Sequence, residues 1–178
     1  MAATSHISGF GNAVSSSPRR VTANTQSRQG GAGPRTWAFD DFTERARRAV
    51  SNAHQEAYRH ITDHISTEHL LLGLMDDNAI GETLGALGLS PDCVRRQVEA
   101  IIGPIQPARP AHLPYSPPVK KVLERSRREA QLRSHDLVDA EHLLWVLTHG
   151  DSAAIGAFAT LGVTPARIRR QLQARWER

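Results

Sequence analysis

The sequence predicts an all-α fold of eight helices, arranged as two four-helix repeats that a pseudo-twofold axis relates. The first observation is an internal duplication, because residues 66–74 (STEHLLLGL) return as residues 139–147 (DAEHLLWVL) about 73 positions later. The second is that the flanks match in the same order, since residues 87–91 (LGLSP) return as residues 161–165 (LGVTP). The third is apolar spacing typical of helices, without convincing strand alternation. Such a duplication indicates two similar helical units packed together.

Two helices are expected in the first half of repeat 1. The first begins at 42–44, where Thr43 is a natural N-cap and Glu44 opposes the positive end of the helix. The second begins near Ser66, ahead of a leucine run that supplies its buried face. The expected inward-facing residues of these two helices are Phe42, Ala46, Ala49, Val50, Ala53, Ala57, Leu70, Leu71 and Leu74.

Glycine and proline mark the other two helices of repeat 1. A short third helix at about 79–87 ends at Gly88, which suits a left-handed C-terminal cap. Ser90 and Pro91 then cap and open the fourth helix, and Gly103 ends it. The fourth helix is expected to bury Val94, Val98, Ile101 and Ile102.

The same pattern of four helices returns in repeat 2. Thr164 and Pro165 open its last helix as Ser90 and Pro91 open the last helix of repeat 1. The expected inward-facing residues are Val119, Val122, Leu123, Ser126, Ala130, Leu143, Leu144, Leu147, Ile155, Phe158, Leu161, Ile168 and Leu172.

A basic tail precedes the double-repeat domain at 39–178. Residues 1–38 are rich in Ser, Gly, Thr, Asn and Arg, so they bury too little apolar surface to order and are expected to be disordered. Repeat 1 then spans about 40–103, a proline-rich linker about 104–114, and repeat 2 about 115–178. The tail lacks acids and resembles a transit peptide, whereas 20 arginines against 2 lysines are typical of a GC-rich bacterial genome. We expect a cytoplasmic bacterial protein, with the plastid stroma as the alternative.

The formal net charge of +4 comes entirely from this tail. The first 39 residues carry four arginines and no acid, so the folded part is neutral and nucleic-acid binding is not expected. Residues 40–103 carry 6 basic and 11 acidic groups (−5), and residues 104–178 carry 12 and 7 (+5). The two repeats therefore either attract each other or prefer different ligands. No apolar run approaches the roughly 20 residues that span a bilayer, so no membrane partner is expected. The single cysteine, Cys93, is expected to be buried and unreactive.

Residues 64–69 (HISTEH) raise the alternative of a metal-dependent hydrolase. Zinc signatures place two histidines and a glutamate on one helical face at fixed spacing. His64, Glu68 and His69 do not fit, because His64 is one position too far away and precedes the helix; repeat 2 has Leu137 in its place. We recognise neither a phosphate-binding loop nor a nucleophile–base pair. No catalytic residue, metal or cofactor is therefore expected.

The repeated Glu-His pair allows two compatible interpretations. Glu68 and Glu141 lie in the first turn of a helix, where unpaired backbone N–H groups stabilise a carboxylate. In the first interpretation the glutamate only stabilises the helix start, and the histidine beside it packs or caps. In the second, the carboxylate lies at the surface and accepts a guanidinium or an amine.

These segments resemble the Clp N-terminal repeat, in order and in spacing, over about residues 40–175. The similarity to the N-domains of ClpC-type unfoldases is the closest. The segments that carry the resemblance are residues 42–46 (FTERA), 66–74 and 87–89 (LGL) for the first repeat, and residues 115–117 (YSP), 120–122 (KKV) and 139–144 (DAEHLL) for the second.

The resemblance implies a module that receives adaptors and substrates for an unfoldase ring, which feeds the ClpP protease. Because the sequence ends at Arg178 without an ATPase module, we expect a free-standing Clp N-domain that is not an enzyme. It would act as an adaptor, an accessory subunit or a decoy. Its expected partners are Clp unfoldase or protease components, adaptors or Clp substrates.

The resemblance also implies two sites for phosphorylated arginine, one formed by Thr43 and Glu68 and the other by Ser116 and Glu141. In each site the glutamate would bind the guanidinium, while the hydroxyl and the helix-start amides bind the phosphate. Repeat 2 departs from the family, because Asp139 adds a carboxylate that repels phosphate and two prolines remove backbone donors. The first site is expected to be the stronger.

An aromatic pair gives an alternative function. Actinobacterial relatives bind cyclic peptide antibiotics through two aromatic residues, and Phe39 and Tyr115 fall at the matching positions. The resemblance then implies a protein that sequesters such peptides. The simpler interpretation is that both rings pack over helix starts.

Overall fold

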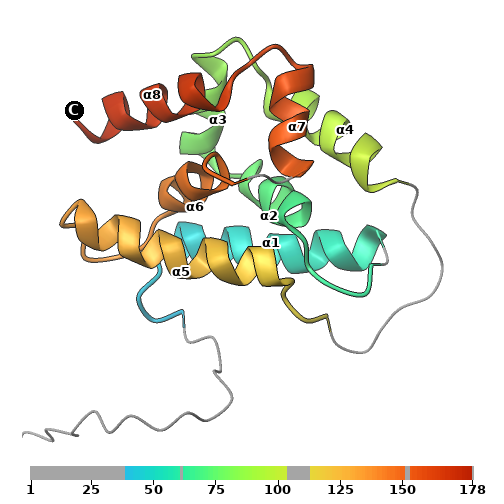
Figure 1. Cartoon of the computed structure of the whole chain (residues 1–178), viewed down its shortest axis with the longest axis horizontal. Coiled ribbons are helices and arrows are strands. Elements are labelled where there is room, and N and C mark those ends of the chain that lie inside the picture. The colour runs from blue at the N-terminus through green and yellow to red at the C-terminus, as the bar shows by residue number, and fades with distance from the viewer. Residues whose placement is uncertain (1–38, 61, 104–112, 151–152, 178) are drawn as a thin grey trace, which may run out of the picture. The chain divides into compact units, whose positions relative to one another are not determined.

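The computed structural model describes residues 39–60, 62–103, 113–150 and 153–177, and it places eight helices within them (Figure 1). The described residues form no β-strand, and they contain only two isolated β-bridges. The predicted all-α fold is therefore confirmed, while the predicted tail and most of the predicted linker lie outside the described residues. In chain order the helices are α1 (Glu44–His60), α2 (Thr67–Leu74), α3 (Asn78–Gly85), α4 (Pro91–Ile102), α5 (Pro117–Leu132), α6 (Ala140–Leu147), α7 (Ala153–Thr160) and α8 (Pro165–Trp176).

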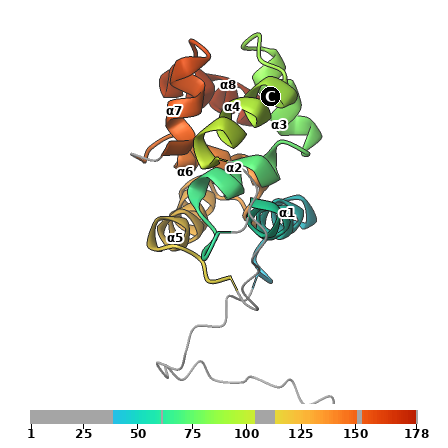
Figure 2. The same ribbon diagram turned by 90° about the vertical axis from the view of Figure 1, so that its right-hand side faces the viewer.

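The two repeats interlock through their helices. Helix α1 packs along α2, and α5 packs along α6, as the predicted duplication requires. Helices α2 and α6 meet in the centre, between α1 and α5 on one side and the other four helices on the other (Figure 2). The outer helices then pair across the repeats, α3 with α8 and α4 with α7. Each repeat therefore completes the packing of the other, which makes one domain of the two.

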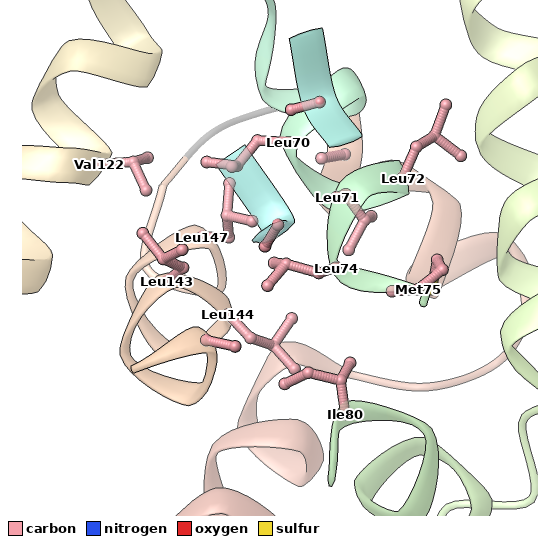
Figure 3. Packing of buried hydrophobic residues seen from close by; sticks show 14 of the residues in the cluster. Leu70, Leu71, Leu72, Leu74, Met75, Ile80, Val122, Leu143, Leu144 and Leu147 are labelled. Carbon is pink, nitrogen blue, oxygen red and sulfur yellow. The ribbon is translucent and has the colours of Figure 1, made fainter. Parts of the chain in front are cut away.

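The duplicated leucine segments form the centre of the core. Leu70 and Leu74 of α2 and Leu143 and Leu147 of α6 are each at most 1% exposed, and Figure 3 shows them gathered between the two helices. Burying a leucine side chain fully stabilises a fold by roughly 1.5–3 kcal/mol. The repeated leucine run is therefore the main link between the two halves.

Gly73 lets α1 and α2 approach more closely than the equivalent pair in repeat 2. A Cβ atom at this position would lie 2.2 Å from the carbonyl oxygen of Ala49 and 2.7 Å from the backbone nitrogen of Ala53. Both atoms belong to the α1 backbone, so no side-chain rotation relieves the clash. The equivalent position of α6 is Val146, which shows that the second helix pair tolerates a branched side chain there.

Several predicted helix signals are confirmed, but two side chains that were expected to be buried are not: Ile101 is exposed, and Cys93 is partly exposed. The hydroxyl of Thr43 accepts a bond from the backbone N–H of Ala46 (3.2 Å), and that of Ser90 accepts one from Cys93 (3.2 Å). Gly88 has a φ of 79°, which is the left-handed conformation expected for a helix stop. The prediction for Cys93 is wrong, because it is partly exposed. The reason is that it lies in the first turn of α4, ahead of the buried Val94. Within the described segments, no helix is long and apolar enough to cross a bilayer.

Backbone hydrogen bonds connect the helix starts crosswise between the repeats. The segment before α1 joins the segment before α6, since Thr43 N–H donates to Val138 (2.9 Å) and Val138 N–H donates to Asp41 (2.8 Å). In the same way the segment before α5 joins the one before α2, since Ser116 N–H donates to Ile65 (3.0 Å). Each repeat thus begins beside the second helix of the other repeat.

Candidate functional site

The crosswise connection separates Thr43 from Glu68, the pair that was expected to form the first site. Thr43 donates its hydroxyl proton to a carboxylate oxygen of Asp139 (2.8 Å), at the start of α6. Glu68 lies near the other end of α1, since the ring of its neighbour His69 lies 6.0 Å from that of His60. His60 is the last of the 17 residues of α1, which at 1.5 Å per residue is about 25 Å long. One ligand group cannot contact both residues.

The hydroxyl and carboxyl groups are exchanged between the two expected sites. Thr43 lies at the start of α6, which carries Glu141 in its first turn. Ser116 lies beside Ile65, just before α2, which carries Glu68 in its first turn. The expected pairing of Ser116 with Glu141 therefore does not form either. We call the region of Ser116 and Glu68, at the start of α2, the Glu68 site. We call the region of Thr43 and Glu141, at the start of α6, the Glu141 site.

The end of α8 covers the Glu141 site. Arg175 donates its Nε–H to one carboxylate oxygen of Glu141 (2.7 Å), and the indole N–H of Trp176 donates to the other (2.8 Å). Arg175 also pairs with Glu82 (2.7 Å), which attaches the end of α8 to α3. Glu141 is only 6% exposed. Its carboxylate is therefore engaged within the chain and is not presented to a ligand.

Arg45 is a second internal partner at the Glu141 site, and sequence reasoning did not identify it. Its guanidinium donates two bonds to Asp77 (2.8 and 2.7 Å) and one to Asp139 (2.7 Å), and lies 3.9 Å from Glu141. The hydrogen bonds to Asp77 raise the pKa of Arg45 despite its partial desolvation. A fixed arginine thus already occupies the acidic cluster that a guanidinium ligand would need. The sequence signal was the FTERA segment, but nothing in the sequence indicated where Arg45 points.

Glu68, in contrast, keeps its carboxylate at the surface. It is partly exposed, and its hydrogen bond comes from the neighbouring hydroxyl of Thr67 (2.9 Å). A cavity of about 240 Å³ opens beside Thr67, with Val122, Val146 and Leu147 among its walls. Lys121 and Arg125 of α5 also line it, and within the described residues neither cation has an ion pair. Thr67, the residue next to Glu68 in the chain, therefore shares a cavity with two cations that have no ion pair among the described residues.

The two histidines of the repeated Glu-His pair cap their helices. The Nδ1 atom of His69 accepts the backbone N–H of Ser66 (3.1 Å), and that of His142 accepts the N–H of Asp139 (2.8 Å). Burial, followed by a neighbouring histidine, lowers the pKa of both His69 and His142 to about 4. Both rings are therefore neutral at pH 7, which is the state that an accepting Nδ1 atom requires. This geometry supports the capping interpretation of the Glu-His pair.

The residues of the metal-dependent hydrolase alternative do not converge. His64 is exposed, lies before α2 and pairs with the carboxylate of Asp63. His69 uses its Nδ1 atom for the helix cap, and its ring is 1% exposed. In the part of the chain that the structure describes, no group of three or more His, Cys, Asp or Glu residues could hold a metal ion. The geometry thus gives this alternative no support.

The expected aromatic pair lies at a separate apolar cavity. The rings of Phe39 and Tyr115 are 6.5 Å apart, edge to face, although they come from different repeats. They line a cavity of about 400 Å³ together with Val50, His54 and Tyr58 of α1. Phe39 also packs on Phe42, 5.1 Å between ring centres, as expected of a ring that covers a helix start. The structure is therefore compatible with both a packing role and a ligand-binding role for the pair.

Comparison with known proteins gives one family and several relatives. Residues 41–156 match the family described as the Clp repeat (R) N-terminal domain. The negative regulator of genetic competence ClpC/MecB of Bacillus subtilis (strain 168) is 36% identical over 137 residues, which are 75% of this chain and 17% of that protein. The chain thus spans less than a fifth of the length of this relative.

Solved structures show the same fold. The N-terminal domain of ClpD from Arabidopsis thaliana superposes with a TM-score of 0.65 at 25% identity, over 80% of this chain and 99% of that one. A ClpV N-domain solved in complex with a VipB peptide has a TM-score of 0.57 at 15% identity, over 81% and 97% of the two chains. The eight-helix arrangement is therefore shared with N-domains of several Clp proteins.

Proposed function

Because this chain belongs to the Clp repeat N-terminal domain family, we propose that it is a non-catalytic binding module for adaptors or substrates of a ClpC-type unfoldase. The family match and the similarity to the Bacillus subtilis relative support this role. The module would act as an adaptor, an accessory subunit or a decoy. Its proposed location is the bacterial cytoplasm, or the plastid stroma if the tail is a transit peptide.

The proposed ligand is a phosphorylated arginine, bound at the Glu68 site alone. The observation that carries this proposal is the contrast between the two glutamates. Glu68 keeps a partly exposed carboxylate, whereas Glu141 already binds Arg175 and Trp176. We therefore assign one site to the chain instead of the two that the resemblance implied.

The chemistry of the Glu68 site suits both parts of such a ligand. A carboxylate forms charge-assisted hydrogen bonds with a guanidinium, and these are about twice as strong as neutral ones. The phosphate would lie toward the cavity, where Lys121 and Arg125 supply positive charge and Thr67 starts α2. The two prolines at the start of α5 offer no amide donors, so these cations take over part of the anion binding.

Replacing Glu68 by alanine is expected to weaken binding of a phosphoarginine-containing peptide at least tenfold. The variant removes the acceptor for the guanidinium, and a tenfold loss corresponds to about 1.4 kcal/mol. Isothermal titration calorimetry of the parent and the variant measures this loss of affinity. The unphosphorylated peptide serves as the control ligand. The free energy of unfolding should change by less than about 1 kcal/mol, because the variant loses only an acid at a helix start.

Glu141→Ala is the matched control, since it removes the equivalent carboxylate of the other repeat. Binding by this variant should stay within about twofold of the parent, because Glu141 is already engaged with Arg175. Equal losses in the two variants, or a parent that does not bind the phosphorylated peptide, would contradict the proposal.

A second candidate function is the sequestration of cyclic peptide antibiotics at the aromatic cavity. The observation in its favour is that Phe39 and Tyr115 line one apolar cavity of about 400 Å³. Phe39→Ala is expected to weaken binding of a cyclic peptide at least tenfold, since burying an aromatic ring contributes about 1.5–3 kcal/mol. Calorimetry measures this, with Leu132→Ala as the control for loss of an exposed apolar side chain elsewhere. An equal effect of both variants, or no binding by the parent, would exclude this function.

A further inference from the structure

One face of α5 carries cations that have no partner in the described structure. Lys121, Arg125 and Arg128 are spaced by four and three residues, so they lie on one side of the helix, and all three are exposed. Leu132 continues the same side one turn later and is 69% exposed. We call these four residues the α5 stripe. Helix α5 lies at the outside of the helix array, with its other side against α6 and α2 (Figures 1 and 2).

Most other arginines of the domain are paired in the described structure, although Arg96, Arg167 and Arg170 are not. Arg127, next to Arg128 in the chain, points the other way, where it binds Asp41 (2.6 Å) and lies over the ring of Phe42 (4.8 Å). Nine described arginines have such partners: Arg45, Arg47, Arg48, Arg59, Arg95, Arg127, Arg133, Arg169 and Arg175. The α5 stripe therefore concentrates free positive charge on one face.

The equivalent face of α1 carries no such row of unpaired cations in the described structure, although the two helices are related by the duplication. Arg48 takes the place of Lys121 and pairs with Glu44 (3.1 Å), and Arg59 takes the place of Leu132 and pairs with Glu56 (3.1 Å). The positions between them hold the uncharged Asn52 and Gln55. The stripe is thus a feature of repeat 2 alone, and packing of the repeated fold does not require it.

We propose that the α5 stripe is a docking surface for an acidic peptide segment that carries an apolar residue at one end. The cations attract carboxylates, and Leu132 offers an apolar contact about 16 Å from Lys121 at 1.5 Å per helical residue. An extended peptide covers this length in about five residues at 3.3 Å each. Lys121 and Arg125 both line the cavity beside Thr67, so an acidic side chain that enters this cavity meets both cations. This surface does not depend on recognition of phosphoarginine.

The test uses two fluorescein-labelled peptides, Glu-Glu-Glu-Glu-Ser-Leu and its reversed sequence, and measures their binding by fluorescence anisotropy. At least one of them is expected to bind, and to weaken about fivefold or more between 50 and 300 mM salt because exposed charges are screened. The triple variant Lys121→Glu, Arg125→Glu, Arg128→Glu should reduce the affinity at least tenfold, and Leu132→Ser about threefold or more. A control peptide with glutamine for glutamate should bind at least tenfold more weakly.

The matched control is the triple variant Arg96→Glu, Arg167→Glu, Arg170→Glu, which makes the same charge change at cations that also lack partners in the described structure. Its affinity should stay within about threefold of the parent. Equal losses in the two triple variants, or tighter binding of double-stranded DNA than of either peptide at equal salt, would overturn the proposal. Self-association of the parent that the α5 triple variant abolishes would instead identify a second copy as the occupant. The peptides carry no phosphoarginine, so their binding tests this surface separately from the phosphoarginine site.

Discussion

Replacing Gly73 by alanine is expected to lower the free energy of unfolding by about 3 kcal/mol. The added Cβ atom would lie 2.2 Å from the carbonyl oxygen of Ala49, and backbone atoms of α1 cannot rotate away. The two helices must separate, which weakens the contacts of the buried Leu70 and Leu74. The gain in helix propensity, about 0.8–1 kcal/mol, offsets only part of this cost. Thermal unfolding should show a midpoint about 10 °C lower.

Gly156→Ala is the matched control, because it makes the same change in the exposed part of α7. A Cβ atom there has nothing within 4 Å, so the variant should be as stable as the parent or about 0.5–1 kcal/mol more stable. If Gly73→Ala unfolded at the same temperature as Gly156→Ala, the close approach of α1 and α2 would not be a constraint on the fold.

Glu141→Ala is expected to reduce stability by about 2–3 kcal/mol while leaving ligand binding unchanged. Both carboxylate oxygens of Glu141 accept bonds from the end of α8, at 2.7 and 2.8 Å. Without the carboxylate, the indole N–H of Trp176 loses its acceptor and Arg175 keeps only Glu82. Urea denaturation measures the loss, and hydrogen exchange should show the last turn of α8 opening first.

Two control variants separate this effect from the simple loss of a charge. Glu177→Ala removes an acid just after α8 that is exposed and bonds to Gln173 (3.0 Å), and it should change stability by less than about 0.5 kcal/mol. Glu68→Ala should reduce ligand binding with little loss of stability. A Glu141→Ala variant as stable as Glu177→Ala would show that the contacts of α8 contribute little to the fold.

Much of the fold could be predicted because its signals are local. A short polar cap or a proline at a fixed offset marks a helix start, and Thr43, Ser90 and Pro91 are at those offsets. A left-handed glycine marks a helix end, and Gly88 and Gly103 do so after α3 and α4. The duplication then fixed the number of helices, and the repeated leucines identified the face that each one buries.

The pairing of the site residues could not be predicted from those signals. The resemblance suggested that Thr43 and Glu68 act together because both belong to repeat 1. The structure instead joins the start of α1 to the start of α6, through backbone bonds between residues almost a hundred positions apart. The contacts of Arg175 with Glu141 and Glu82 have the same cause, since α8 packs on both α3 and α6.

The sequence by itself determined the two repeats, their helices, the leucine core and the family, because each depends on the order and spacing of neighbouring residues. Only the tertiary structure decided which of the two glutamates keeps a partly exposed carboxylate and which is bonded within the chain. Glu68 and Glu141 stand in nearly identical segments, and the difference between them comes from the helices that lie beside them. The end of α8 supplies two hydrogen-bond donors to Glu141, whereas Glu68 stays partly exposed next to its own helix start. Packing between distant segments, which no local pattern encodes, makes equivalent residues chemically different.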